Sequence, residues 1–229
     1  MIKRFGFLSV AACVVGACSA APPPQPPAMI SSTQSADKGA RPMFQATDLG
    51  LLEFDDRDRW QRVEEIFDDL NISDGSVVAD IAAGGGWFSD RLARRVGPAG
   101  IVYAEEIQPT MIEAMKRRIQ VENITNIQPV LGTPVDPHLP AGTIDAVLIV
   151  NAFRDIDAPV PLLEHLRIAL DRRGLIGVVD FTPGGGGPGP ASGERVAPEA
   201  IIAAAEAAHL RLQARYPVPP FEFLLVFGK

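Results

Sequence analysis

The chain has 229 residues, and its 28 acidic residues outnumber 21 Lys and Arg, which gives a formal net charge of −7 at pH 7. No basic run or aromatic–basic stripe follows residue 43, which argues against a nucleic-acid partner. Both cysteines, Cys13 and Cys18, lie near the N-terminus, so the remainder of the chain can form neither an internal disulfide nor a thiolate metal site.

Residues 1–18 have the pattern of a signal peptide, with Lys3 and Arg4 followed by apolar and small residues up to position 17. This run is too short to span a bilayer by itself. Residues 15–18 resemble a bacterial lipobox, which implies lipidation of Cys18. A lipobox ending at Cys13, or ordinary cleavage after Ala20, remains an alternative. We expect an exported, periplasmic protein whose only membrane attachment is a lipid at Cys18, anchored in the bacterial outer membrane.

Residues 19–43 are dense in Pro, Ala, Ser and Gln and show no apolar periodicity. This composition predicts a disordered or polyproline-like linker that tethers a folded domain away from a membrane surface. Residues 44–229 are enough for one domain with a single hydrophobic core. The first helix of this domain is predicted from an apolar stripe made by Trp60, Val63, Phe67 and Leu70.

The most informative segment follows that helix. Residues 77–86 predict a buried strand that ends in the acid Asp80 and runs straight into a glycine-rich turn, and Trp87–Val96 has helical spacing. Such a turn brings backbone N–H groups close to a ligand, as in sites for nucleotide-like cofactors. A dinucleotide fingerprint needs a small residue at its sixth position, which is Trp87 if the turn is counted from Ala82. An NAD-linked oxidoreductase is therefore disfavoured.

Strands and helices alternate from residue 77 to residue 180, which predicts an α/β fold with a doubly wound, mostly parallel sheet. The later strands are expected at residues 100–106, 126–131, 143–151, 174–180, 211–216 and 221–228. Helices are expected from Pro109, at residues 159–170 and at residues 198–208. Glycine and proline dominate residues 182–193, a loop expected at the carboxyl edge of the sheet, where open α/β folds bind ligands.

Small residues at alternate positions after an acid resemble motif I of class I S-adenosylmethionine (SAM)-dependent methyltransferases: Asp80, Ala82, Gly84 and Gly86. The resemblance covers residues 44–229 and implies a Rossmann-like, seven-stranded sheet with its last strand antiparallel. The segment 56–62 is similar to one in a bacterial small-molecule branch of unassigned substrate. Ala82 departs from the family, which has glycine there.

The resemblance also implies roles for individual residues around SAM. Asp80, Gly84 and Gly86 would seat the methionine part of the cofactor. Ala82 is also a cofactor-binding position, and its methyl group could crowd the methionine end. Glu106 would bind both ribose hydroxyls, since a carboxylate can accept two hydrogen bonds at once; Glu105 is the alternative. Asp136 would lie near the adenine amino group. Asp80 could also serve to brace the loop.

Residues 151–155 follow the fourth expected strand, where family members place groups against the methyl acceptor. Related sequences often have an aromatic residue and then histidine, whereas this chain has Phe153 and Arg154. Arginine cannot act as a base near neutral pH, so Arg154 either binds an anionic group or is a solvated charge. We nominate Asn151 and Asp155 as the catalytic, acceptor-side residues.

The expected function is methyl transfer from SAM to a small-molecule acceptor by in-line displacement. Its leaving thioether is neutral, so alignment and desolvation are the main tasks. The alternative is an exported ligand-binding domain of the same fold without transfer activity, because the cofactor is made in the cytoplasm. The three histidines show no metal-ligand spacing, and no metal is expected.

Overall fold

The computed structural model describes residues 57–229. The signal peptide at 1–18, the linker at 19–43, the domain start at 44 and lipidation at Cys18 all lie outside the described residues, so they stay predictions.

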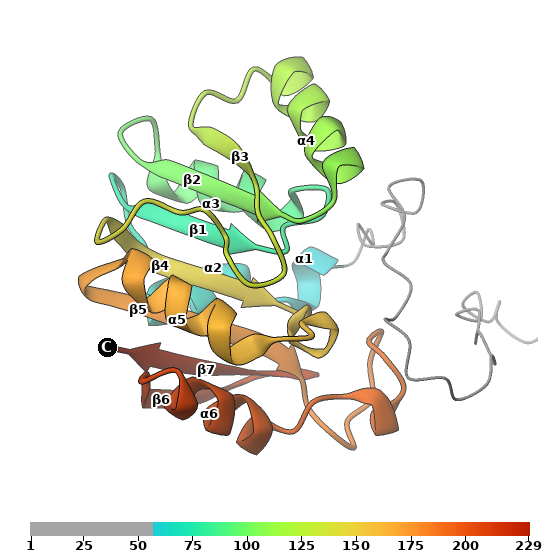
Figure 1. The fold of residues 1–229 in the computed structure, drawn as a ribbon. Coiled ribbons are helices and arrows are strands. Elements are labelled where there is room, and N and C mark those ends of the chain that lie inside the picture. Colours follow the sequence, from blue (N-terminus) through green and yellow to red (C-terminus); the bar gives the residue numbers. More distant parts are fainter. Residues whose placement is uncertain (1–56) are drawn as a thin grey trace, which may run out of the picture. The chain divides into compact units, whose positions relative to one another are not determined.

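The described chain forms one seven-stranded sheet in the order β3-β2-β1-β4-β5-β7-β6 (Figure 1). The strands are β1 (Val77–Ile81), β2 (Ile101–Glu106), β3 (Ile127–Leu131), β4 (Ile144–Val150), β5 (Leu170–Phe181), β6 (Arg211–Val218) and β7 (Glu222–Gly228). The first five pair in parallel, and β7 runs antiparallel to both β5 and β6. This confirms the predicted α/β class and the antiparallel last strand. The strand order reverses between β1 and β4, the place where open α/β sheets bind ligands.

Helices cover both faces of the sheet (Figure 1). They are α1 (Arg57–Trp60), α2 (Val63–Asp69), α3 (Trp87–Val96), α4 (Pro109–Glu122), α5 (Pro159–Ala169) and α6 (Pro198–Ala207). Buried side chains of α2, α3 and α4 form one core, and those of α5 and α6 form a second core on the opposite face. The last three helices begin with proline, whose missing N–H is harmless at a first helical position.

The helix expected across residues 60–70 is interrupted in the structure. α1 ends at Trp60 and α2 begins at Val63, because Arg62 has a left-handed φ of 51°. The intervening Gln61 is fully buried, with its side chain directed to the start of β7. The apolar spacing therefore predicts the packing correctly but gives no sign of the break.

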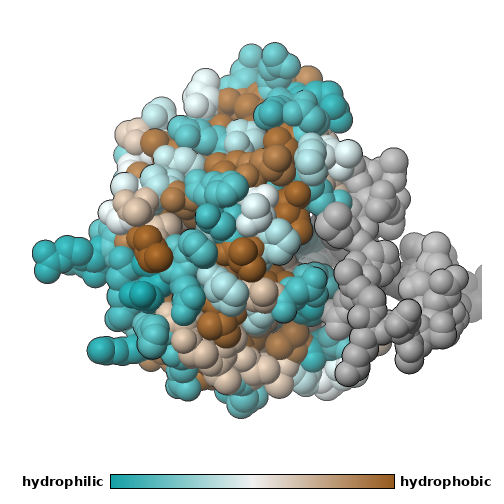
Figure 2. Space-filling view, viewed as in Figure 1, coloured by the Kyte–Doolittle hydropathy of each residue, from teal (hydrophilic) through white to brown (hydrophobic). Residues whose placement is uncertain are grey.

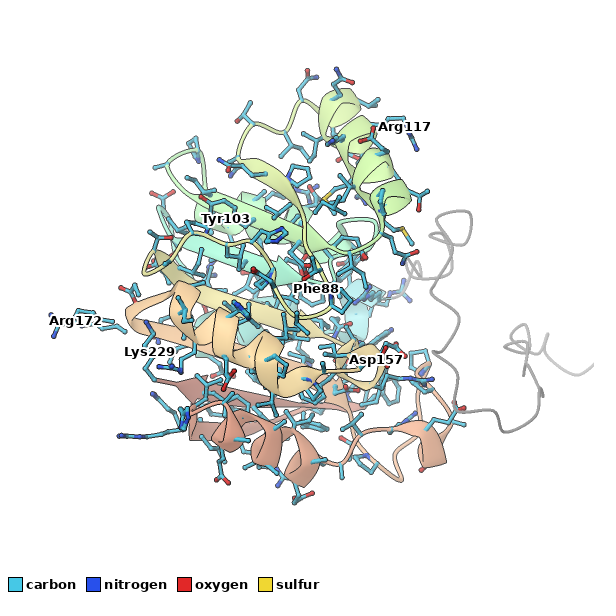
Figure 3. The ribbon with its side chains drawn as sticks, in the orientation of Figure 1. Phe88, Tyr103, Arg117, Asp157, Arg172 and Lys229 are labelled. Carbon is cyan, nitrogen blue, oxygen red and sulfur yellow. The ribbon has the colours of Figure 1, made fainter. Side chains whose placement is uncertain are left out.

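β5 is longer than the expected 174–180, because it starts at Leu170, which pairs with Ile144 of β4. A register shift follows this pair, and a Cβ on Gly174 would come within 2.6 Å of the Ile144 carbonyl oxygen. Glycine permits that close approach. The polar residues before Gly174 conceal the strand in the sequence, and Arg172 points away from the molecule in Figure 3.

On the face seen in Figure 2, hydrophobic residues lie in small groups among hydrophilic ones. Within residues 57–229, no helix is both long and apolar enough to cross a membrane.

Candidate functional site

The turn between β1 and α3 has an unusual backbone. Ala82, Gly84 and Gly86 have φ values of 55°, 54° and 84°, all in the left-handed region. Glycine enters this region freely, whereas an L-residue such as alanine is strained by roughly 1–2 kcal/mol. The N–H of Ala82 donates to Oε2 of Glu105 at 3.3 Å. The departure from the family pattern at Ala82 is thus accommodated in the same backbone conformation that glycine would take.

Asp80 is buried beneath this turn and braces it. Its Oδ2 accepts a 2.6 Å hydrogen bond from the Ser89 hydroxyl in the first turn of α3. Burial raises the pKa of Asp80 to about 6, although the Ser89 bond and the charge of Arg57 oppose the rise. The bracing role of Asp80 is one of the two that the sequence allows, whereas its partner Ser89 could not be identified there.

Glu106 at the end of β2 joins two loops. Its Oε2 accepts from the N–H of Gly84 at 3.2 Å, and Oε1 accepts from the N–H groups of Ile107 and Gln108 at 2.8 and 3.1 Å. A carboxylate offers about four lone-pair sites, and three of those on Glu106 are occupied by these N–H groups. One site is left for a ligand hydroxyl, so a second hydroxyl would have to compete with a backbone N–H for the same oxygen. The Glu106 carboxylate, beside the glycine turn, can therefore accept one hydroxyl of an adenosyl ribose at its free lone-pair site.

Glu105 precedes it on the strand and points to the opposite face, because successive strand residues alternate. Its Oε1 is buried without a hydrogen-bond partner among the described residues, and a Cβ on Gly132 would lie 2.0 Å from that atom. Burial, together with the nearby charges of Glu106 and Asp80, raises the pKa of Glu105 to about 8 against the opposing hydrogen bond from Ala82, so the side chain is mostly uncharged at neutral pH. An uncharged, sequestered carboxyl is a weaker ribose ligand than Glu106.

Asp136 lies in the connection between β3 and β4, where its Oδ1 accepts the N–H of His138 at 2.9 Å. The side chain of Asp136 is 41% exposed. These contacts describe an ordered turn, and the adenine role of Asp136 stays a prediction.

A second group of polar residues, which we call the Glu222 network, joins segments that are distant in sequence. Asn151 follows β4 and donates from Nδ2 to Glu222 Oε1 at 2.7 Å. Gln61 donates from Nε2 to the other oxygen of Glu222 and accepts at Oε1 from Nε of Arg57 at 2.9 Å. Gln61 and Glu222 are 0% and 3% exposed.

Burial raises the pKa of Glu222 to about 7. The hydrogen bonds from Asn151 and Gln61 and the charge of Arg57 oppose this rise, while Asp180 adds to it. Burial likewise raises the pKa of Asp180, near the end of β5, to about 6. The carboxyl edge of the sheet thus holds buried carboxyls that titrate near neutral pH.

Several buried polar atoms of this edge have no hydrogen-bond partner within the described part of the chain: Trp60 Nε1, Asn151 Oδ1 and Asp180 Oδ2. The Trp60 ring lies 6.0 Å from Phe181 and 5.9 Å from Phe221, centroid to centroid. Buried polar atoms are nearly always paired, so unpartnered ones beside an aromatic wall are typical of a ligand site.

Of the two nominated catalytic residues, only Asn151 contacts Glu222. Asp155 lies in the short 3₁₀ helix Phe153–Asp155, with its side chain 57% exposed and 3.3 Å from Nε of Arg154. Arg154 is only 19% exposed and also lies 3.6 Å from Glu194, so it is an ion-paired, largely buried side chain rather than a solvated charge.

Gln61, Asp180 and Glu222 are site residues that were not predicted from the sequence. Glu222 left a signal, since an acid between two phenylalanines in an apolar strand has to be buried or lie at an end. Gln61, between a tryptophan and an arginine, gave no sign in the sequence that it would be buried. The part of the chain that the structure describes holds no cluster of three or more His, Cys, Asp or Glu able to bind a metal ion.

Residues 78–174 match a family described as "Methyltransferase domain". Protein-L-isoaspartate O-methyltransferase of Methanothrix thermoacetophila is 29% identical over 98 residues, which cover 43% of this chain and 46% of that protein. Demethylmenaquinone methyltransferase of a Geobacillus strain is 22% identical over 108 residues, 47% of this chain and 45% of that protein. The chain therefore spans less than half the length of these curated relatives.

Solved structures share the fold more widely. A SAM-dependent methyltransferase from Aquifex aeolicus superposes with a TM-score of 0.76 at 20% identity, over 81% of this chain and 98% of the other. Geranyl diphosphate C-methyltransferase from Streptomyces coelicolor, solved with S-adenosylhomocysteine, gives a TM-score of 0.63 at 13% identity, over 82% and 85% of the two chains. At these identities the likeness establishes the fold.

Proposed function

We propose that this protein transfers the methyl group of SAM to a small-molecule acceptor, as the match of residues 78–174 to a methyltransferase domain family supports. One observation carries the proposal. Glu106 is bonded to the N–H of Gly84, so the acid suited to a ribose and the left-handed turn suited to close ligand approach form one cradle.

Each side of the cradle has its own task. Asp80, Ala82, Gly84 and Gly86 hold the methionine part, and Glu106 accepts the ribose hydroxyls. Asp136 contacts the adenine. SAM supplies a methyl group activated by a positive sulfonium, and the thioether that remains is neutral. The protein then has to align the acceptor and exclude water, rather than stabilise a charged leaving group.

A small acceptor is supported by charge and by the carboxyl edge. The chain carries a net charge of −7, which disfavours binding of a polyanion such as tRNA. Asn151 and the aromatic residues Trp60, Phe181 and Phe221 form the acceptor side, as an apolar wall with few polar atoms.

Export and a lipid anchor at Cys18 complete the proposal, on the strength of the leader sequence alone. Labelling of bacterial cells with radioactive palmitate should mark the wild-type protein and Cys13→Ser but not Cys18→Ser. Labelling that survives Cys18→Ser would contradict the anchor without touching the enzymatic assignment.

Calorimetric titration of the purified protein with SAM tests the cofactor assignment. We expect binding by the wild type and about 10- to 100-fold weaker binding by Glu106→Gln, since hydrogen bonds to a charged group contribute roughly 1.5–3 kcal/mol. Glu206→Gln on the exposed side of α6 is the matched control and should bind as the wild type does. A wild-type protein that fails to bind SAM would overturn the proposal.

A further inference from the structure

Glu222, the first residue of β7, is a buried carboxylate that two other segments of the chain hold by hydrogen bonds. Gln61 from the break between α1 and α2 donates to one oxygen, and Asn151 from the end of β4 donates to the other. These bonds link residues 161 and 71 positions apart. The two donors match the two oxygens of one carboxylate, and their bonds favour its charged form against the burial that opposes it.

We propose that Glu222 accepts the proton that the methyl acceptor loses during transfer, and that Gln61 and Asn151 are positioning residues that hold its carboxylate. This inference rests on the proposed methyltransferase function. It defines the acceptor class as a neutral X–H nucleophile, with X a heteroatom such as oxygen or nitrogen whose lone pair attacks the methyl carbon. It excludes a tertiary amine or a thioether, because neither has a proton to give.

The step balances in atoms and charge. A lone pair of X forms the new bond to the methyl carbon, the bond between that carbon and sulfur breaks, and its electron pair stays on sulfur. The proton of X–H passes to a carboxylate oxygen of Glu222, which becomes a neutral carboxylic acid. One positive and one negative charge disappear together, so the buried site ends without net charge. Each oxygen of Glu222 accepts one hydrogen bond from the network and keeps a second lone-pair site for this proton.

The other buried carboxyls suit this role less well. Asp80 is bonded to Ser89 beneath the motif I turn, and Glu105 is sequestered against Gly132. Asp180 precedes Phe181, which is the cross-strand partner of Glu222, so Asp180 points to the opposite face of the sheet. Asp180 also accepts the N–H of Phe181 at 2.8 Å.

The proton affinity of Glu222 supports the assignment that the geometry makes. Burial raises its pKa to about 7, so charged and neutral forms are both populated at neutral pH, as an efficient general base requires. The charged groups that act on it are Arg57 from α1, which lowers the pKa, and Asp180 from β5, which raises it. An anionic acceptor would meet repulsion from the Glu222 carboxylate, which is consistent with a neutral one.

SAM and S-adenosylhomocysteine provide a matched pair of probes, because they differ by one methyl group and the positive charge. A cation bound beside Glu222 lowers its pKa and expels its proton. Calorimetric titrations of the full protein at pH 7 in buffers of different ionisation enthalpy should show release of up to about half a proton with SAM and much less with S-adenosylhomocysteine.

Glu222→Gln should abolish most of the SAM-specific release and weaken SAM binding more than S-adenosylhomocysteine binding. Glu206→Gln should leave the release unchanged. Gln61→Ala is the second variant, and it should move the midpoint of proton release to higher pH, because the bond from Gln61 favours the charged form. A merely structural Gln61 would lower the thermal midpoint of unfolding without moving that pH.

Release that persists in Glu222→Gln, or wild-type binding of both ligands with equal release, would overturn this inference while leaving SAM binding intact. Failure of the wild type to bind either ligand would remove the proposed function and this inference with it.

Discussion

The two halves of the carboxyl edge are built differently. At the cofactor half, Glu106 and Asp80 bond to groups within 22 positions in sequence, and most of their donors are backbone N–H groups. At the acceptor half, the Glu222 network consists of side chains that bond to one another across 71 and 161 positions. Backbone donors do not depend on the identity of the donor residue, whereas the Glu222 network requires particular side chains at Gln61 and Asn151.

Arg57 connects the halves. Its charge lowers the pKa of both Asp80 and Glu222, and its Nε donates to Gln61. The guanidinium also lies 4.1 Å from the centroid of the Trp87 ring, at the start of α3. One cation therefore acts electrostatically on a buried carboxyl of each half.

The largest expected effect is the dependence of stability on pH. The folded-state pKa values of Asp80, Glu105, Asp180 and Glu222 are raised by burial to between about 6 and about 8. Between pH 4.5 and pH 8 the folded state therefore binds more protons than the unfolded state, and stability falls as pH rises. The loss should be on the order of several kcal/mol, measured by urea denaturation of the ligand-free protein.

Two variants assign this loss to the two halves. Glu105→Gln should reduce the dependence of the free energy of unfolding on pH up to about pH 8. Glu222→Gln should reduce it only up to about pH 7. A wild-type stability that rises between pH 4.5 and pH 8 would show that these carboxyls are ionised and paired in the folded protein. It would contradict the assignment of raised pKa values to both halves of the carboxyl edge.

The second effect is specific to the cofactor half. Gly84→Val places a β-branched residue at a φ of 54°, which costs on the order of 1–3 kcal/mol, and it disturbs the backbone whose N–H donates to Glu106. We expect SAM affinity to fall at least about 10-fold and the thermal midpoint to drop. Gly193→Val is the control, since Gly193 has no left-handed φ and a Cβ added there would meet no atom within 4 Å. If Gly84→Val and Gly193→Val lower SAM affinity and the thermal midpoint equally, the turn between β1 and α3 has no specific part in binding SAM.

The sequence predicted the cofactor half well because its signals are local. An acid, a run of small residues and a helix start lie close together and identify the turn, and the apolar spacing of the strands identifies the sheet. The Glu222 network could not be predicted in this way. Gln61 lies in a break that the apolar stripe conceals, and it meets Glu222 only because β7 inserts between β5 and β6. Asn151 was identified from its place after β4, but its partner was not.

Ala82 gives a smaller effect of opposite sign. Ala82→Gly relieves the strain of a φ of 55°, and it should stabilise the protein by roughly 0.5–1 kcal/mol after the extra flexibility of glycine in the unfolded chain is deducted. Ala203→Gly, at an exposed position inside α6, should destabilise by about 1 kcal/mol. If Ala82→Gly destabilises by as much as the control, the left-handed conformation at residue 82 is wrong.

The smallest effect is expected at Asp155 and separates the two nominated acceptor-side residues. Asp155→Asn alters an ion pair whose carboxylate is largely exposed, so the free energy of unfolding should change by less than about 1 kcal/mol. Asn151→Ala removes a donor to Glu222, so it should move the midpoint of SAM-linked proton release to higher pH, while Asp155→Asn should leave that midpoint within about 0.3 units. Equal shifts in the two variants would mean that the acceptor half extends to the 3₁₀ helix Phe153–Asp155, and that proton transfer depends on more than the Glu222 network.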